Sequence, residues 1–208
     1  MITEPPYNPL DKKNLGASVA QAMLVSEVHP LTDLTKFNGA GIYAIYYAGA
    51  FACYETISNH NKDGLFKVPI YVGKAVPPGA RKGGSGLGDN VAPALFKRLL
   101  EHAKSINAAH NLDLMDFHCR YLVVEDIWIP LGESLLIAMT SPIWNKVVDG
   151  FGNHTPGAGR FKQARSKWDV LHPGREWAVK CADREETPDQ ISREVTAFLR
   201  TAPMPRKT

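Results

Sequence analysis

The chain of 208 residues has few cysteines, little charge imbalance and no long apolar run, and each of these shortages excludes a class of protein. Its three cysteines, Cys53, Cys119 and Cys181, form no CxxC pair, so neither a thiolate zinc site nor a disulfide framework is indicated. No apolar run approaches the roughly 20 residues of a membrane-spanning helix. The first residues lack the basic segment and apolar core of a signal peptide, so a reducing cytoplasm is the expected compartment.

The net charge is small, but the charges are unevenly distributed. Against 24 Lys and Arg stand 21 Asp and Glu, a net of +3. Residues 67–104 carry seven basic and two acidic side chains, and residues 155–168 carry four basic and no acidic ones. This segregation can present a positive face to phosphates, although scattered solvated lysines would give the same counts.

The hydrophobic pattern predicts an α+β fold, with a small antiparallel three-stranded sheet flanked by helices. The first two strands form an antiparallel pair with a long polar connection, which holds a turn cluster at 59–64. The glycine- and proline-rich segment 77–90 is typical of a loop. Strands are expected at 41–49, 68–75 and 117–126, and helices at 16–27, 93–107, 129–140, around 160–169 and at 188–200.

Two tyrosines stand beside glycines in the first two expected strands, in Gly41-Ile42-Tyr43 and Tyr71-Val72-Gly73. Tyrosines in strands are usually packing residues with a satisfied hydroxyl. A chemical role would require both hydroxyls at one end of the sheet. It would also require a nearby cation, since a phenol with a pKa near 10 needs help to accept a proton.

Arg98 and His102 are four residues apart in the expected helix and therefore share a face. Leu95 and Leu99 are expected on the opposite, core-facing side. The pair could simply be solvated. Alternatively, the guanidinium binds a phosphate and stabilises transition-state charge, while the imidazole hydrogen-bonds the phosphate, a water or a tyrosine hydroxyl.

Glu133 lies within the otherwise apolar segment 129–144. A carboxylate there needs a cation, hydrogen-bond donors or access to water. A single Mg²⁺ would suffice, because it is usually held by one or two carboxylates with waters and substrate phosphate. The alternative is a first-turn glutamate favoured by the helix dipole after Pro130. Asn145, which follows that segment, could likewise be only a capping or turn residue.

These residues occur in the order found in the GIY-YIG family of metal-dependent nucleases, which the chain resembles from Gly41 to Asn145. The resemblance implies that Glu133 holds one Mg²⁺ per site, with Mn²⁺ as a possible substitute. It also implies that Tyr43 lies beside the attacking water as a candidate general base, a role that His102 could fill instead. The implied catalytic residues are Tyr43, Tyr71, Arg98, His102, Glu133 and Asn145.

Between Tyr43 and Tyr71 lie 27 residues, a longer connection than is usual in the family. This insertion and the glycine-rich, basic tail at 150–178 resemble the type II restriction endonucleases that cleave CCGCGG. That likeness implies a homodimer on a palindromic DNA site, products with 5′-phosphate and 3′-hydroxyl ends, and a cognate methyltransferase as a functional partner. The recognition sequence follows from the likeness alone.

Basic residues in the loop and the tail are candidates for DNA contact. Arginine on guanine is the commonest specific contact in the major groove, but phosphate contact or solubility is the alternative for each residue. The candidates are Lys74, Arg81, Lys82, His154, Arg160, Lys162, Arg165 and Lys167, with Arg175 as a further one.

We therefore expect residues 1–208 to form a single nuclease domain in three parts. Residues 1–37 form an N-terminal arm and short helix. Residues 38–148 form the catalytic core, with insertions at 46–69 and 75–92. Residues 149–208 form a DNA-contacting extension. The arm and the first insertion are the expected dimer surface.

The alternative function is a catalytically inactive or non-specific nucleic-acid-binding protein of the same fold. An inactive descendant should have lost some of Tyr43, Arg98 and Glu133, and all three are present. A phosphate-binding loop at 79–88 is disfavoured, because the GxxxxGK[ST] pattern is absent.

Overall fold

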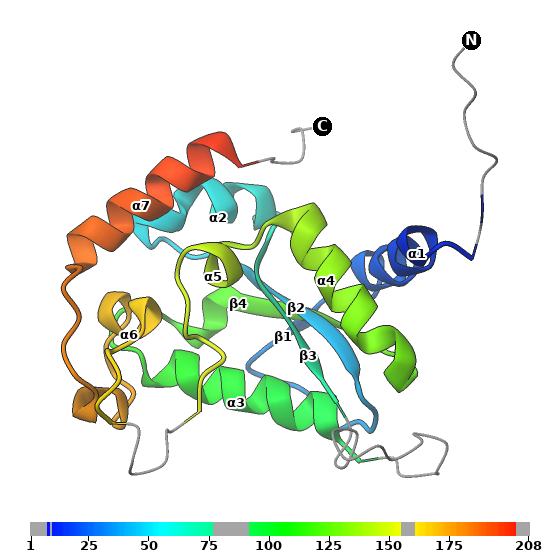
Figure 1. Ribbon diagram of the computed structural model, residues 1–208, viewed down its shortest axis with the longest axis horizontal. Helices are drawn as coiled ribbons and strands as arrows, with labels where there is room; N and C mark the ends of the chain where they lie inside the picture. Colours follow the sequence, from blue (N-terminus) through cyan, green and yellow to red (C-terminus); the bar gives the residue numbers. More distant parts are fainter. Residues whose placement is uncertain (1–7, 9, 77–91, 155–160, 203–208) are drawn as a thin grey trace.

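The computed structural model describes residues 8, 10–76, 92–154 and 161–202, and its centre is an antiparallel sheet (Figure 1). The sheet has four strands rather than the three expected, in the order β1-β4-β2-β3. The additional strand β1 has only two residues, too few for an alternating pattern to reveal it. The strands are β1 (His29–Pro30), β2 (Gly41–Tyr47), β3 (Pro69–Ala75) and β4 (Phe117–Val123).

Strand β2 lies between β3 and β4, and all seven of its residues are buried. Because side chains alternate along a strand, Tyr43, Ile45 and Tyr47 enter one apolar cluster while alternate residues enter another. In the register, Tyr43 stands opposite Gly73 of β3. The expected antiparallel pairing of these two strands is confirmed.

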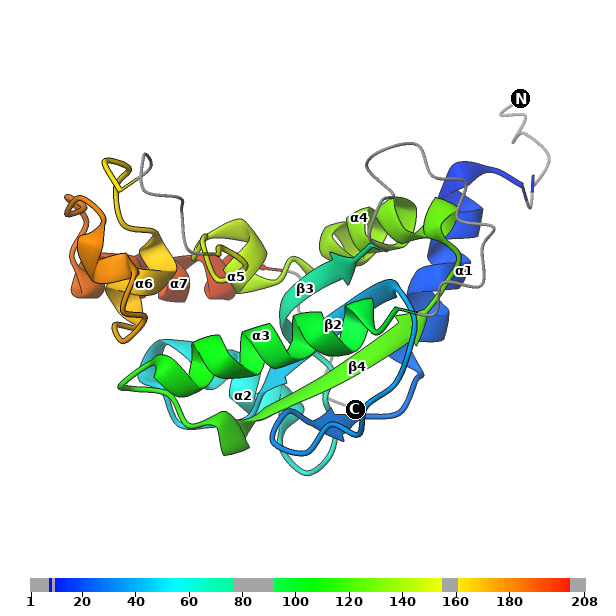
Figure 2. The ribbon, with the colours of Figure 1, turned by 90° about the horizontal axis from the view of Figure 1, so that it is seen from below.

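Helices cover both faces of the sheet (Figures 1 and 2). Helix α3 packs on the face that carries Tyr43, while α1 and α4 pack together on the other face. The helices are α1 (Lys12–Leu24), α2 (Glu55–Asn61), α3 (Ala94–Ala108), α4 (Ile129–Thr140), α5 (Ile143–Lys146), α6 (Lys167–Leu171) and α7 (Pro188–Thr201). Within the described part of the chain, no helix has the length and apolarity needed to cross a bilayer.

The expected helices α3, α4 and α7 are confirmed, and other boundaries differ for local reasons. Helix α1 begins earlier than expected because the Asp11 carboxylate caps it by accepting from the Lys13 N–H. The expected turn cluster at 59–64 is a turn at 62–64, and its first three residues are the end of α2. There Asn61 is buried, and its amide bonds to the backbone of Tyr47 and Val68. Helix α6 is shorter than expected and starts after Ser166, whose hydroxyl accepts from the Asp169 N–H.

The C-terminal extension packs on the same core as the sheet. Trp168 of α6 and Val195 of α7 belong to the apolar cluster that contains Tyr43. A buried polar chain crosses this boundary. The Trp144 indole N–H donates to the Tyr54 hydroxyl over 2.8 Å, and that hydroxyl lies 2.7 Å from Nε2 of His172. The extension is therefore continuous with the core.

Candidate active site

The pairing of β2 with β3 brings the two motif tyrosines together. Tyr43 and Tyr71 project from the same face of the sheet, with ring centroids 6.2 Å apart. Gly73 faces the ring of Tyr43, and a Cβ at that position would overlap the Tyr43 hydroxyl. The glycine of the Tyr71-Val72-Gly73 motif therefore leaves the space that the Tyr43 side chain occupies.

Helix α3 places an imidazole against the first tyrosine. The Tyr43 hydroxyl lies 2.6 Å from Nε2 of His102, whose exposed fraction is only 2%. Leu95 and Leu99 are buried on this same stripe of α3, so the expectation that they lie opposite His102 is wrong. Their spacing from His102, seven and three residues, returns to the same helical face.

Burial controls the protonation of this pair. Desolvation, reinforced by the charge of Arg98, lowers the pKa of His102 well below its usual value, so the imidazole is neutral near pH 7. Desolvation raises the pKa of Tyr43 well above 10, with Arg98 acting in the opposite direction. The pKa of Tyr71 is raised for the same reason. Both phenols are therefore protonated in the free protein.

Arg98 lies at the rim of this cluster and is held by three partners. Its Nη2 donates to the Gly152 carbonyl over 2.8 Å. Its Nη1 donates to Oε2 of Glu101 over 2.9 Å and to Nε2 of His154 over 2.5 Å. The guanidinium therefore connects the core helix α3 to the first residues of the extension.

Glu133 is paired with a lysine from the neighbouring strand. The distance from Nζ of Lys74 to Oε2 of Glu133 is 2.6 Å, and 18% of the Glu133 side chain is exposed. The cation that the apolar setting of this carboxylate requires is thus present in the chain itself. Because α4 begins at Ile129, Glu133 lies beyond the first turn, and the helix-dipole alternative is wrong. Burial is the main cause of the raised pKa values of Tyr43 and Tyr71, and the negative charge of Glu133 contributes to both in the same direction.

The donor set decides which metal this site could hold. Among the described residues, no group of three or more His, Cys, Asp and Glu side chains is placed to bind a metal. Zinc sites normally need at least three such protein ligands, so zinc does not fit. A lone, partly exposed carboxylate fits Mg²⁺, whose coordination is completed by waters and phosphate oxygens.

Asn145 does not reach the tyrosine hydroxyls but holds the backbone of their strand. Its Oδ1 accepts from the Val72 N–H, and its Nδ2 donates to the Val72 carbonyl, each over 2.8 Å. Val72 is the middle residue of the second motif, and β3 is an edge strand. Asn145 therefore satisfies backbone groups that the sheet leaves unpaired, a stabilising contact rather than a helix cap.

The expected DNA-contacting residues have different environments. Arg81, Lys82 and Arg160 lie outside the described residues. Lys162 is exposed. Arg165 and Lys167 form ion pairs with Asp183 over 3.2 Å and with Glu194 over 2.6 Å. His154 contacts Arg98 and Lys74 contacts Glu133, as described above, whereas Arg175 is buried with 4% exposure and offers no surface to DNA.

Three neighbours of the site were not predicted from the sequence. The Phe151 ring stacks on His102 with centroids 4.5 Å apart, and the Gly152 carbonyl binds Arg98. A Cβ at Gly152 would lie 2.8 Å from the Tyr71 hydroxyl, so the glycine permits this close approach. Glu101 could have been found from its i, i+3 spacing to Arg98. The contacts of Phe151 and Gly152 cross about fifty positions and leave no such signal.

Comparison with protein families agrees with this geometry. The family model described as the Eco29kI GIY-YIG domain matches residues 35–199. The match includes both tyrosine motifs, α3, α4 and most of the extension. No curated protein matches the chain.

Proposed function

The chain belongs to the Eco29kI family of GIY-YIG nucleases, and we propose that it is a type II restriction endonuclease that hydrolyses phosphodiester bonds of double-stranded DNA. The observation that carries this proposal is the convergence of Tyr43, Tyr71, His102 and Arg98 on one face of the β2–β3 pair. Glu133 of α4 is paired with Lys74, the residue that follows Gly73 in β3. The phenols and the neutral imidazole can transfer protons, and the guanidinium can stabilise the negative charge that develops when a phosphodiester is hydrolysed.

Tyr43 and His102 together provide a path for the proton of the attacking water. A neutral imidazole accepts at one ring nitrogen, so the Tyr43 hydroxyl donates to Nε2 of His102 when Nδ1 carries the proton. The Tyr43 oxygen can then take a proton from water while its own proton passes to His102. This coupled transfer avoids a free phenolate, which burial makes costly. Bound phosphate, being negative, raises the pKa of His102 and favours the transfer.

Arg98 is proposed to stabilise the charge on the scissile phosphate. In the free protein its Nη1 contacts Glu101, half of whose side chain is exposed, so that ion pair is weak. A phosphate dianion in the transition state would compete well for this donor. The Nη2 contact with the Gly152 carbonyl leaves the guanidinium correctly oriented while the exchange takes place.

Glu133 is proposed to hold one Mg²⁺ per site, with Mn²⁺ as a possible substitute. The ion would neutralise phosphate charge and acidify water near the reacting phosphorus. Lys74, released from its ion pair, would then contact a phosphate of the DNA backbone. Asn145 would act indirectly, by fixing the strand that carries Tyr71.

The proposal also covers the oligomeric state, the recognition sequence, the product ends and the DNA contacts. We infer a homodimer that cleaves the palindrome CCGCGG and leaves 5′-phosphate and 3′-hydroxyl ends, in a cytoplasm where a cognate methyltransferase protects host DNA. An isologous dimer presents two equal sites to the two strands of a palindrome. In this proposal residues 1–208 form one nuclease domain, and the extension contacts DNA. The proposed contacts are Lys74, Arg81, Lys82, His154, Arg160, Lys162, Arg165 and Lys167.

Digestion of a plasmid of known sequence in the presence of Mg²⁺, followed by sequencing of the ends, tests this function. Discrete cuts at CCGCGG with 5′-phosphates support the whole proposal. Discrete cuts elsewhere overturn only the recognition sequence, and a smear indicates a non-specific nuclease. Binding without any cleavage would favour a DNA-binding protein that has kept the fold and lost activity.

A further inference from the structure

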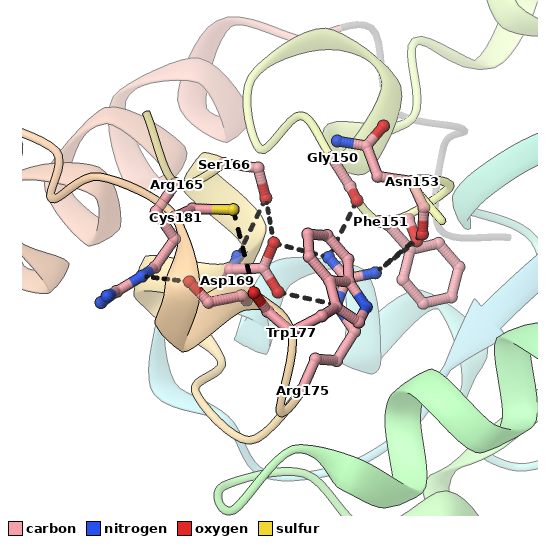
Figure 3. Close-up of polar contacts among 10 residues, drawn as sticks. Gly150, Phe151, Asn153, Arg165, Ser166, Asp169, Arg175, Trp177 and Cys181 are labelled. Atoms are coloured by element: carbon pink, nitrogen blue, oxygen red, sulfur yellow. Dashed lines mark hydrogen bonds and ion pairs between the residues drawn. The ribbon is translucent and has the colours of Figure 1, made fainter. Parts of the chain in front are cut away.

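Arg175 lies in the extension, far along the chain from α3, and its guanidinium is buried and hydrogen-bonded through all of its nitrogens (Figure 3). Its Nε and Nη2 donate to the two carboxylate oxygens of Asp169 over 2.6 and 2.7 Å. The Trp168 and Trp177 rings stand 4.4 and 4.7 Å from its central carbon. Asp169 is fixed in turn by the Ser166 hydroxyl at 2.6 Å.

The remaining donors of Arg175 hold the loop formed by residues 149–154. Nη2 donates to the Gly150 carbonyl over 3.0 Å. Nη1 donates to the carbonyls of Phe151 and Asn153 over 3.1 and 3.3 Å. Figure 3 shows these contacts meeting at one guanidinium. Gly150 has a φ of +98°, a conformation that glycine adopts readily and that other residues rarely take.

The opposite side of the 149–154 loop contacts the catalytic residues. The Gly152 carbonyl accepts from Arg98, and Nε2 of His154 accepts from the same guanidinium. The Phe151 ring stacks on His102 and meets Tyr71 edge-on at 5.0 Å. Arg175 thus binds the carbonyls of residues 150, 151 and 153, while Arg98 binds the carbonyl of residue 152.

We propose that Arg175 is a positioning residue for the hydrolytic reaction, which acts through the 149–154 loop to set the orientation of Arg98. The inference rests on the proposed nuclease function. Its physical basis is that a planar fork with five N–H groups can bind a carboxylate and three carbonyls at fixed angles, which a lysine cannot do. The extension is then a part of the active site as well as a DNA-contacting element.

Single-turnover cleavage by Arg175→Lys at saturating DNA tests the inference, with DNA affinity and far-UV circular dichroism measured in parallel. We expect the cleavage rate to fall on the order of 10²-fold, the scale for a small displacement of a catalytic group, with affinity unchanged. Arg184→Lys is the matched control. Arg184 also binds a carboxylate through two nitrogens, that of Glu186, but has no hydrogen bond to the 149–154 loop. Arg184→Lys should therefore cleave at the normal rate.

A double-mutant cycle separates positioning from general stabilisation. If Arg175 acts through Arg98, then Arg175→Lys should change the rate little when Arg98 is already alanine. The inference is overturned if the rate losses of the two single variants multiply in the double variant. It is also overturned if Arg175→Lys cleaves at the normal rate or changes only the affinity for DNA. If the wild-type protein cleaves no DNA, it is the proposed function that fails.

A second variant decides the question if Arg175→Lys does not fold. Trp177→Leu removes one of the rings that cover the guanidinium and leaves the ion pair with Asp169 in place. A smaller loss of single-turnover rate, again absent in the Arg98→Ala background, supports positioning. A normal rate for the folded Trp177→Leu protein contradicts it.

Discussion

The described residues include two buried tyrosine–histidine pairs, and comparing them tests the proton path. Tyr43 contacts His102 at 2.6 Å in the site, whereas Tyr54 contacts His172 at 2.7 Å in the core. Tyr43→Phe removes one oxygen and leaves the buried Nε2 of His102 unpaired. Loss of that partner costs about 1–3 kcal/mol of unfolding free energy, or about 2–4 °C in Tm for each kcal/mol in a domain of this size.

The effect of Tyr43→Phe on cleavage should be far larger than its effect on stability. Loss of a general base lowers the rate by on the order of 10²–10⁴, so single-turnover cleavage at saturating DNA should fall by that factor with affinity preserved. Tyr54→Phe is the control. It also leaves the Trp144 indole N–H without its acceptor, so it should destabilise at least as much, and yet cleave at the normal rate. Normal cleavage by Tyr43→Phe, or an equal loss in Tyr54→Phe, would refute the proton path.

Three further predictions concern the metal, acid stability and the edge strand. Glu133→Gln keeps the shape of the side chain and removes its charge, so Mg²⁺-dependent cleavage should be lost while binding of DNA, measured by gel shift, persists; undiminished cleavage would exclude the metal assignment. Urea unfolding at pH 7 and pH 5 should show lower stability in acid, because His102 and His172 bind protons in the unfolded state near pH 6.5 but stay neutral when folded, His172 down to a pKa of about 3. Each histidine lowers the unfolding free energy by about 1.4 kcal/mol for each pH unit below 6.5, until its folded pKa is reached. Equal stability at the two pH values would contradict their burial in the neutral form. Asn145→Ala should lower the unfolding free energy by about 1–3 kcal/mol, because two backbone groups of Val72 lose their partner; unchanged urea unfolding would remove this role.

The elements with strong periodicity were predictable from the sequence. The spacing of Leu95 and Leu99 predicted α3, and the β-branched and aromatic runs predicted β2, β3 and β4. The two-residue β1 could not be predicted, because it exists only through pairing with β4. Helix α2 was not predicted, because its last residue, Asn61, is of a type common in turns. In the structure, Asn61 is held by hydrogen bonds to the backbone of Tyr47 and Val68.

The site was predictable as a set of residues but not as a set of contacts. Order and residue type indicated Tyr43, Tyr71, Arg98 and Glu133. The structure brings the first three together around His102 and pairs Glu133 with Lys74. Sequence could not reveal that Lys74 neutralises Glu133, since the pairing depends on how α4 crosses β3. The prediction that Arg175 contacts DNA was wrong. Nothing in the sequence around this basic residue indicates that it is buried between two tryptophans.

The most direct test of the central claim is Mg²⁺-dependent cleavage of plasmid DNA by the wild-type protein and by Arg98→Ala, purified in parallel. We expect discrete double-strand cuts by the wild type, none in the presence of a chelator, and a rate lower by on the order of 10²–10³ for Arg98→Ala at saturating DNA. Equal cleavage by the two proteins, or no cleavage by the wild type on any DNA, would contradict it.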